Sequence, residues 1–180
     1  DAQDFFFSST RHLWKDQNKL VPDYKGNDII LYAFAAFFKQ SRDKKTKLIL
    51  IKKGPDVEGS QRLIQDLGIE DYVVWIDEIK RNRLEAYYQG ASVCFGQFGA
   101  PALTYVALEP LSNATPCSSF FIDNNNNIPF YSTMPPVLNT RDYEKIADFM
   151  YSLTTDASYA SKLSHESWLW AKENCSEEKL

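Results

Sequence analysis

Short, continuously apolar runs alternate with longer amphipathic segments along most of the chain. A run without polar alternation is typical of a strand that is buried on both faces of a parallel sheet. A run that contains prolines instead predicts a short edge strand, because proline cannot donate to a central ladder. We expect buried strands at residues 5–9, 47–52, 72–76, 92–95 and 117–122, and the edge strand at 135–139.

The segments between these runs have the spacing of amphipathic or buried helices. Asn27 or Asp28 is suited to cap the first helix at its N-terminus, and Gly68 is suited to end the second one. Strands alternating with helices predict an α/β fold: a doubly wound, Rossmann-like parallel sheet of about six strands with helices on both faces. One such domain accounts for residues 1–180. The expected helices cover 29–40, 58–67, 81–88, a segment that starts at Leu103 and Thr104, 141–153 and 158–172.

Composition places the chain among ordinary globular proteins. Of its 180 residues, 44% are hydrophobic and 24% are charged, and the formal net charge is −4. This acidic balance argues against nucleic acid as a partner, since nucleic-acid-binding surfaces carry an excess of Lys and Arg. No apolar run approaches the roughly 18 residues of a membrane span, and no signal-peptide pattern opens the chain.

The three cysteines, Cys94, Cys117 and Cys175, form no C-x-x-C pair and no Cys/His cluster with zinc spacing. We interpret them as free thiols in a reducing compartment, which favours a cytoplasmic location. The chain starts without Met, which is consistent with a domain cut from a longer protein.

Polar and glycine residues follow each expected strand. In a doubly wound sheet the carboxyl ends of the strands form the edge where ligands bind, so we expect these residues to converge on one crevice. They are Arg11 and Lys25 after the first strand, Gly54 after the second, Asp77 and Ile79 after the third, and Gln97, Gly99, Leu103, Thr104 and Glu109 after the fourth.

The types of residue in this set suit a nucleotide sugar. Two cations, Arg11 and Lys25, together with the unpaired amides of a helix start at Leu103 and Thr104, make a receptor for a diphosphate. Glu109 lies one to two turns into the same helix, where a carboxylate can accept two hydroxyls of a ribose. We expect no metal, because the sequence has no Asp-x-Asp motif to hold one.

Each of these residues also has a purely structural interpretation. Arg11 could pair with Asp4 or Asp16, Lys25 could be a solvated loop lysine, and Glu109 could be a half-exposed helix residue. His12 and His165 have no partner pattern, and we assign neither a role.

Several short motifs keep a fixed order along nearly the whole chain. In that order they resemble the C-terminal, donor-binding domain of the glycosyl transferases group one family, which are retaining enzymes built from two Rossmann domains. The motifs are Arg11, Lys25-Gly26, Gly54-Pro55, Val74-Trp75, Leu84 to Tyr88, Ala91-Ser92-Val93, Ala107-Leu108-Glu109 and Thr115-Pro116-Cys117.

The resemblance implies a role for each matching residue. Arg11 and Lys25 would be catalytic, holding the donor diphosphate and stabilising the departing nucleotide. Glu109 would hold the ribose, the amides of Leu103 and Thr104 would hold phosphate, and the turn from Asp77 to Ile79 would edge the nucleobase. Gly54, Gln97 and Gly99 would complete the donor site.

The resemblance further implies a glycosyltransferase that needs no metal and transfers a sugar with retention of configuration, in glycan or polysaccharide synthesis. An N-terminal acceptor-binding domain would be the missing half. The isolated domain would then be inactive, and the whole enzyme could associate peripherally with the cytoplasmic face of a membrane through that half.

This sequence departs from the family pattern at several positions of the same stretch. Pro101 stands where the family has the carboxylate that holds the transferred sugar, Thr104 and Ala114 replace glycines, and Pro110 follows Glu109 inside the helix. Two alternatives therefore stay open: an inactive, glycosyltransferase-like interaction module, and a nucleotide-sugar epimerase. A nicotinamide enzyme is disfavoured, because no G-x-G-x-x-G follows any strand.

Overall fold

In the part of the chain that the structure describes, six parallel strands form one sheet in the order β3-β2-β1-β4-β5-β6. A computed structural model describes residues 4–15, 24–41, 45–122, 131 and 133–175. This strand order is that of the doubly wound Rossmann fold, and the predicted fold class is confirmed. The strands are β1 (Phe5–Ser8), β2 (Lys47–Ile51), β3 (Val73–Ile76), β4 (Val93–Phe95), β5 (Cys117–Ser119) and β6 (Val137–Asn139).

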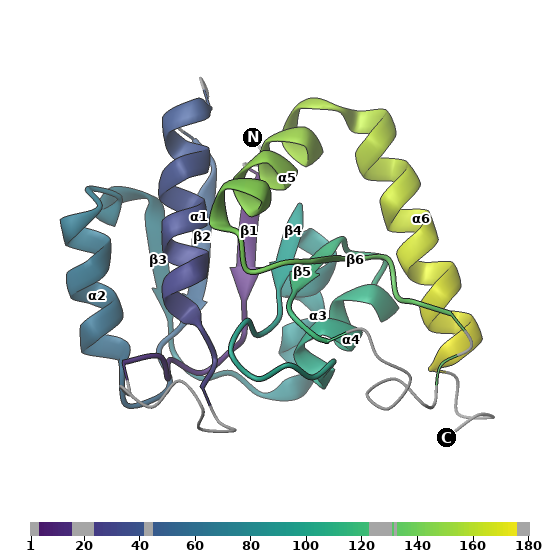
Figure 1. Ribbon diagram of the computed structural model, residues 1–180, viewed down its shortest axis with the longest axis horizontal. Coiled ribbons are helices and arrows are strands. Elements are labelled where there is room, and N and C mark those ends of the chain that lie inside the picture. Colours follow the sequence, from purple (N-terminus) through teal and green to yellow (C-terminus); the bar gives the residue numbers. More distant parts are fainter. Residues whose placement is uncertain (1–3, 16–23, 42–44, 123–130, 132, 176–180) are drawn as a thin grey trace.

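The strand order reverses at β1, which lies between β2 and β4. Phe6 is paired in register with Leu48 on one side and with Val93 on the other. The chain therefore winds first toward β3 and then, after α3, toward β6, which leaves a switch point at the carboxyl ends of β1 and β4. The arrow of β1 points toward this edge of the sheet, at the bottom of Figure 1.

Helices cover both faces of the sheet, as predicted. In Figure 1, α1 and α5 lie side by side in front of the sheet, while α3 and α4 lie behind it. The last helix, α6, contacts both α4 and α5. The helices are α1 (Asn27–Gln40), α2 (Val57–Asp66), α3 (Arg81–Gly90), α4 (Tyr105–Ser112), α5 (Tyr143–Thr155) and α6 (Ala157–Asn174), with a 3-10 turn at Glu70–Tyr72. None of them is long and apolar enough to cross a membrane, among the residues that the structure describes.

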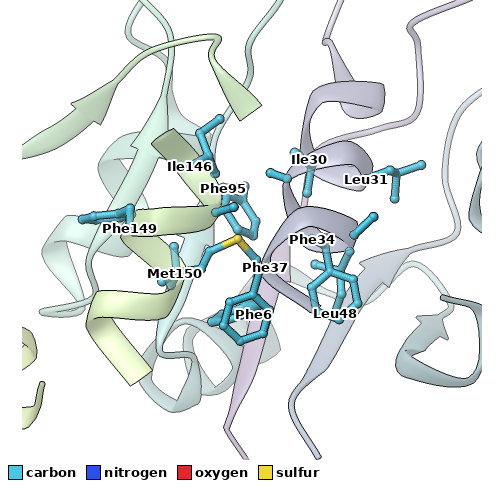
Figure 2. Close-up of a cluster of buried hydrophobic side chains, with 14 of the residues drawn as sticks. Phe6, Ile30, Leu31, Phe34, Phe37, Leu48, Phe95, Ile146, Phe149 and Met150 are labelled. Atoms are coloured by element: carbon cyan, nitrogen blue, oxygen red, sulfur yellow. The ribbon is translucent and has the colours of Figure 1, made fainter. Parts of the chain in front are cut away.

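The larger core lies between the sheet and the helices α1, α2 and α5. Figure 2 shows side chains of β1, α1 and α5 pointing toward one another, with Phe6 and Phe37 in edge-to-face contact at 4.9 Å between ring centroids. Fully burying a side chain of this size stabilises the fold by about 1.5–3 kcal/mol. A smaller core on the other face packs Phe7 and Cys94 against Tyr88 of α3.

The predicted start of the first helix was wrong in its detail. Neither Asn27 nor Asp28 is the N-cap; the cap is Gly26, in a left-handed conformation with φ 68°. The buried Asn27 side chain is used instead to tie down the loop after β1, accepting from Leu13 N at 3.1 Å and donating to Thr10 O. The Asn27 side chain therefore makes tertiary hydrogen bonds instead of capping the helix.

The strand predicted at 117–122 ends earlier, at Ser119. Beyond it the backbone leaves the ladder, because Phe120 N donates to Gln97 O and Phe121 N donates to Asn139 Oδ1. The prediction for Gly68 is confirmed: it has φ 66° and closes α2, with Ile69 N donating to Ile64 O. The predicted four-asparagine loop at 124–127 lies outside the described residues.

Candidate functional site at the carboxyl edge of the sheet

Two loops meet at the switch point. The loop after β1 contributes Tyr24 and Lys25, and the loop after β4 contributes 98–100. Phe98 N donates to Lys25 O at 2.9 Å, and Ala100 N donates to Tyr24 O at 3.0 Å. Gly99 lies so close to Tyr24 that a Cβ on it would overlap the carbonyl group of Tyr24. The close approach therefore requires glycine at this position.

The side chains of Lys25 and Gln97 connect the same loops. Lys25 Nζ donates to Gln97 Oε1 at 3.0 Å. Gln97 is only 2% exposed, and its Nε2 also donates to the carbonyl oxygens of Ala100 and Ala102 at 3.4 Å. Gln97 thus links Lys25 to the segment that leads into α4, and three of the predicted site residues, Lys25, Gln97 and Gly99, lie together.

Arg141 also stabilises the loop after β4, and the sequence did not predict this contact. Its Nε donates to Phe98 O at 2.6 Å and its Nη2 donates to Gly99 O. The guanidinium also lies over the ring of Phe120, 3.9 Å from its centroid. A forked donor of this kind fixes two successive carbonyl groups at once.

Arg11 lies earlier in the same loop after β1, and Gly54 lies in the loop after β2. Arg11 is half-buried and is followed by His12, whose N donates to Lys53 O at 2.7 Å and whose O accepts from Asp56 N at 3.1 Å. Gly54 has φ 111°, and a Cβ there would overlap the backbone of His12. The backbone on either side of Arg11 is therefore held against the end of β2.

The side chain of His12 is buried beneath this loop. It is 1% exposed, its Nδ1 lies 2.7 Å from Ser60 Oγ, and its ring packs against Trp75. Trp14 Nε1 donates to the same hydroxyl at 2.7 Å. Burial lowers the pKa of His12 to about 4, against a smaller opposing effect of Asp56. His12 is consequently neutral at physiological pH and stabilises the loop that carries Arg11.

Helix α4 starts beside a cavity. The helix begins at Tyr105 with Thr104 as its N-cap, so the amides of Leu103 and Thr104 precede the first turn instead of lying within it. Among the residues that the structure describes, the Thr104 side chain makes no cap hydrogen bond and its buried Oγ1 has no hydrogen-bond partner. The cavity measures about 550 Å³ and is lined by Arg81, Glu85, Tyr88, Leu103, Thr104, Tyr105, Leu108, Glu109, Ser112, Asn113, Tyr131, Asn174 and Cys175.

Glu109 lies in the wall of this cavity with its side chain 23% exposed. Its Oε1 forms a 2.9 Å ion pair with Arg81 Nη2, and its Oε2 accepts from the hydroxyl of Tyr88 at 2.9 Å. The structure therefore brings three predicted residues, Leu103, Thr104 and Glu109, to one cavity.

The turn after β3 lies at the start of α3, near Arg81. Asp77 is exposed, and Ile79 packs half-buried against the smaller apolar core. Between them, Glu78 forms a 2.5 Å ion pair with Lys53. Asp77 and Ile79 are thus at the same edge of the sheet as the other predicted residues, but neither lines the cavity. Its lining also lacks the other predicted residues apart from Leu103, Thr104 and Glu109, so the expected single crevice does not form; these are Arg11, Lys25, Gly54, Gln97 and Gly99.

Several lining residues were not predicted as site residues. Tyr88 ends one of the ordered motifs but was given no role, Arg81 is a helix residue of ordinary spacing, and Asn174 lies at the end of α6, far along the chain. Only the packing of α3, α4 and α6 brings them together. Within the described ranges, no group of three or more His, Cys, Asp or Glu could hold a metal ion.

Comparison with known proteins gives matches in structure only. No known protein-family profile matches the sequence, and no curated protein matches it either. S. aureus TarM, solved with UDP, alpha-GlcNAc-glycerol and fondaparinux, aligns with a TM-score of 0.75 at 12% identity, over 99% of this chain and 34% of its own. Anabaena HepE, solved with UDP, aligns at 0.71 and 14% identity, over 96% and 45%.

The C-terminal domain of the group 1 glycosyltransferase LpcC from Francisella tularensis aligns with a TM-score of 0.71 at 13% identity, over 97% of this chain and 87% of its own. This chain has the fold of the C-terminal domain of group 1 glycosyltransferases. The expectation of that fold from the ordered motifs is confirmed. The chain spans between a third and a half of TarM and HepE, whereas it matches most of the single LpcC domain.

Proposed function

We propose that this chain is the donor-binding domain of a glycosyltransferase, which transfers a sugar from a nucleotide diphosphate sugar with retention of configuration. One observation supports the proposal most directly. Glu109 and the N-cap of α4 face the same cavity of about 550 Å³. The buried Oγ1 of the N-cap residue Thr104 has no hydrogen-bond partner within the described part of the chain. A carboxylate and a helix start can bind a ribose and a phosphate of one nucleotide.

In this proposal Arg11 and Lys25 act on the diphosphate. Both follow β1, and Lys25 is oriented by Gln97 on the opposite side of the switch point. Two positive charges held there would stabilise the negative charge that develops on the departing nucleotide. We assign this role to the two side chains without a bound metal, and we name no protein nucleophile.

The remaining predicted residues would surround the rest of the donor. The backbone from Asp77 to Ile79 would border the nucleobase. Gly54 and Gly99 would shape the donor site indirectly, because each lets two of its loops pack closely together. Arg81 lies between the turn and Glu109, so it would neighbour the nucleoside.

The acceptor would be brought by a second, N-terminal domain, and this domain alone would transfer nothing. TarM and HepE are more than twice as long as the part that this chain matches. We place the complete enzyme in glycan or polysaccharide synthesis in the cytoplasm, where the second domain would attach it peripherally to the cytoplasmic face of a membrane. The solved structure of WaaG, a glycosyltransferase involved in lipopolysaccharide biosynthesis, has the same fold at 13% identity.

The test is a titration of the isotope-labelled chain with UDP, GDP and ADP, followed by NMR and calorimetry. We expect one of them to shift the amides of Leu103, Thr104 and Gln97 and to saturate. Glu109→Gln should weaken that binding by about 1.5–3 kcal/mol, because a hydrogen bond to a charged group is lost. Glu166→Gln on the exposed face of α6 is the matched control and should leave the affinity unchanged. The absence of any shift at millimolar nucleotide would refute the proposal.

A second function is favoured by one residue. Pro101 is exposed at the position where the family has a sugar-binding carboxylate, which supports an inactive module that binds nucleotide or a partner protein without transfer. In that case a full-length protein would bind the nucleotide yet neither hydrolyse nor transfer its sugar. Interconversion of free nucleotide sugars without an acceptor would instead indicate an epimerase.

A further inference from the structure

We propose that Tyr88 is a positioning residue for Glu109: its hydroxyl holds one carboxylate oxygen, Oε2, so that the other, Oε1, is the oxygen offered to the ligand. This inference rests on the proposed function, in which Glu109 accepts hydroxyl groups of the ribose. It adds Tyr88 to that site and gives the two carboxylate oxygens different roles: Oε2 binds Tyr88, and Oε1 binds the ligand.

The first step is the direction of the hydrogen bonds. Tyr88 OH lies 2.9 Å from Glu109 Oε2 and 3.0 Å from Ser9 Oγ. An ionised carboxylate only accepts, so the single phenolic proton goes to Glu109. Ser9 must then donate its own hydroxyl proton to the phenolic oxygen. The end of β1 is thereby linked through Tyr88 to the carboxylate on α4.

The second step is the rigidity of Tyr88. It is 2% exposed, its ring packs against Phe7 at 5.6 Å between centroids, and its carbonyl oxygen accepts from Thr115 Oγ1 at 2.7 Å. Burial raises the pKa of the phenol above its ordinary value, and Glu109 adds to the increase. Tyr88 therefore stays protonated at neutral pH and remains a donor of fixed position.

The third step is the contrast between the two partners of Glu109. Arg81 holds Oε1 with a side chain that is 81% exposed. An exposed ion pair contributes little and exchanges readily, whereas Tyr88 is buried and its ring is fixed by packing against Phe7. A ligand hydroxyl that enters the cavity can replace Arg81 at Oε1 but not Tyr88 at Oε2.

The experiment compares UDP with 2′,3′-dideoxy-UDP, which lacks both ribose hydroxyls, by calorimetry on the 180-residue chain. The ratio of the two affinities measures the contact with Glu109 and does not depend on the phosphates. We expect the unchanged chain to prefer UDP by about tenfold or more, and Glu109→Gln to abolish most of that preference. Tyr88→Phe should lower the ratio by about 3- to 10-fold with a smaller change in dideoxy-UDP binding.

Two further variants separate positioning from general damage. Tyr87→Phe removes a hydroxyl from the neighbouring tyrosine, whose ring stacks on Phe7, and should leave the ratio unchanged. Ser9→Ala leaves Tyr88 intact and removes only the Ser9 hydroxyl that bonds to the phenolic oxygen. This variant tests the link from Ser9 through Tyr88 to Glu109 if Tyr88→Phe does not fold. The inference would be overturned if Glu109→Gln lost the preference for UDP while Tyr88→Phe and Ser9→Ala both kept the affinity ratio unchanged. That result would leave the proposed function intact. Failure of the unchanged chain to bind UDP, GDP or ADP would refute the proposed function itself.

Discussion

Lys25 Nζ donates a 3.0 Å hydrogen bond to Gln97 Oε1, and this bond crosses the point where the sheet reverses its strand order. Lys25 comes from the loop after β1, and Gln97 comes directly after β4. An amide oxygen accepts this bond, which holds the ammonium group at the carboxyl edge of the sheet. An anion bound there would meet a cation whose position is already fixed.

Replacing Lys25 by Met tests this electrostatic role. Met keeps most of the length of the side chain and removes the charge and the donor. We expect UDP affinity to fall about tenfold or more, and the remaining binding to depend less on salt, because screening acts on charge pairs. Calorimetry at low and high ionic strength measures both effects.

The comparison ligand is uridine, which carries no phosphate and should bind Lys25→Met as it binds the unchanged chain. Lys162→Met, at an exposed position on α6, is the control for a general change in net charge. Equal losses for UDP and uridine would contradict a phosphate role for Lys25.

Ala114 carries a backbone strain that substitution should relieve. It has φ 58°, a left-handed conformation, and it closes α4: its N donates to Leu111 O, and Thr115 N donates to Pro110 O. This is a helix end that favours glycine. Ala114→Gly should stabilise the fold by about 0.5–1 kcal/mol, since the strain that is removed exceeds the entropy that glycine adds to the unfolded chain.

Gly68 provides the reverse experiment in the same protein. It closes α2 with φ 66°, and a Cβ at this position would meet no atom of the described residues within 4 Å. Gly68→Ala should therefore destabilise the fold by about 1 kcal/mol through backbone strain alone. Urea unfolding measures the free energy of unfolding of both variants. A loss of stability in Ala114→Gly would contradict the presence of backbone strain at Ala114.

The fold could be predicted from the sequence because its signals are local and repeated. Continuously apolar runs such as 47–52 predict buried parallel strands, and Gly68 marks a helix end. Errors arose where a tertiary contact competed with a local rule. Asn27 has the chemistry of an N-cap, but its side chain bonds to Leu13 and Thr10 of a neighbouring loop.

The candidate site could be predicted only in part. Strand ends locate its edge, and the order of the motifs singles out Lys25 and Glu109. The direction of a side-chain hydroxyl has no signature in a single sequence, so the contact of Tyr88 with Glu109 was not foreseen. The same holds for Arg141, which contacts carbonyl groups more than 40 positions earlier in the chain.

Gly99→Ala tests how closely the two loops of the site must approach. The new Cβ would overlap the carbonyl group of Tyr24, which accepts from Ala100 N. The loops must separate, so we expect a loss of about 1–3 kcal/mol in stability and weaker UDP binding. Gly90→Ala is the control: its Cβ would approach only the outer atoms of the Phe5 ring, at 3.0 Å, and it should cost less. Equal stability of Gly99→Ala and the unchanged chain would show that the loops tolerate separation.

His12 should make the fold sensitive to acid. Its pKa is about 4 in the folded chain and 6.5 in the unfolded chain, so the unfolded state binds more protons between these two values. Stability is therefore lost as pH falls from 6.5 toward 4, by up to about 3 kcal/mol. His12→Asn keeps a polar group near Ser60 but does not titrate, and urea unfolding between pH 7 and pH 4 should show a shallower loss for this variant. His165→Asn, at an exposed position on α6, should follow the unchanged chain. Parallel curves for His12→Asn and the unchanged chain would mean that carboxylates alone cause the acid sensitivity.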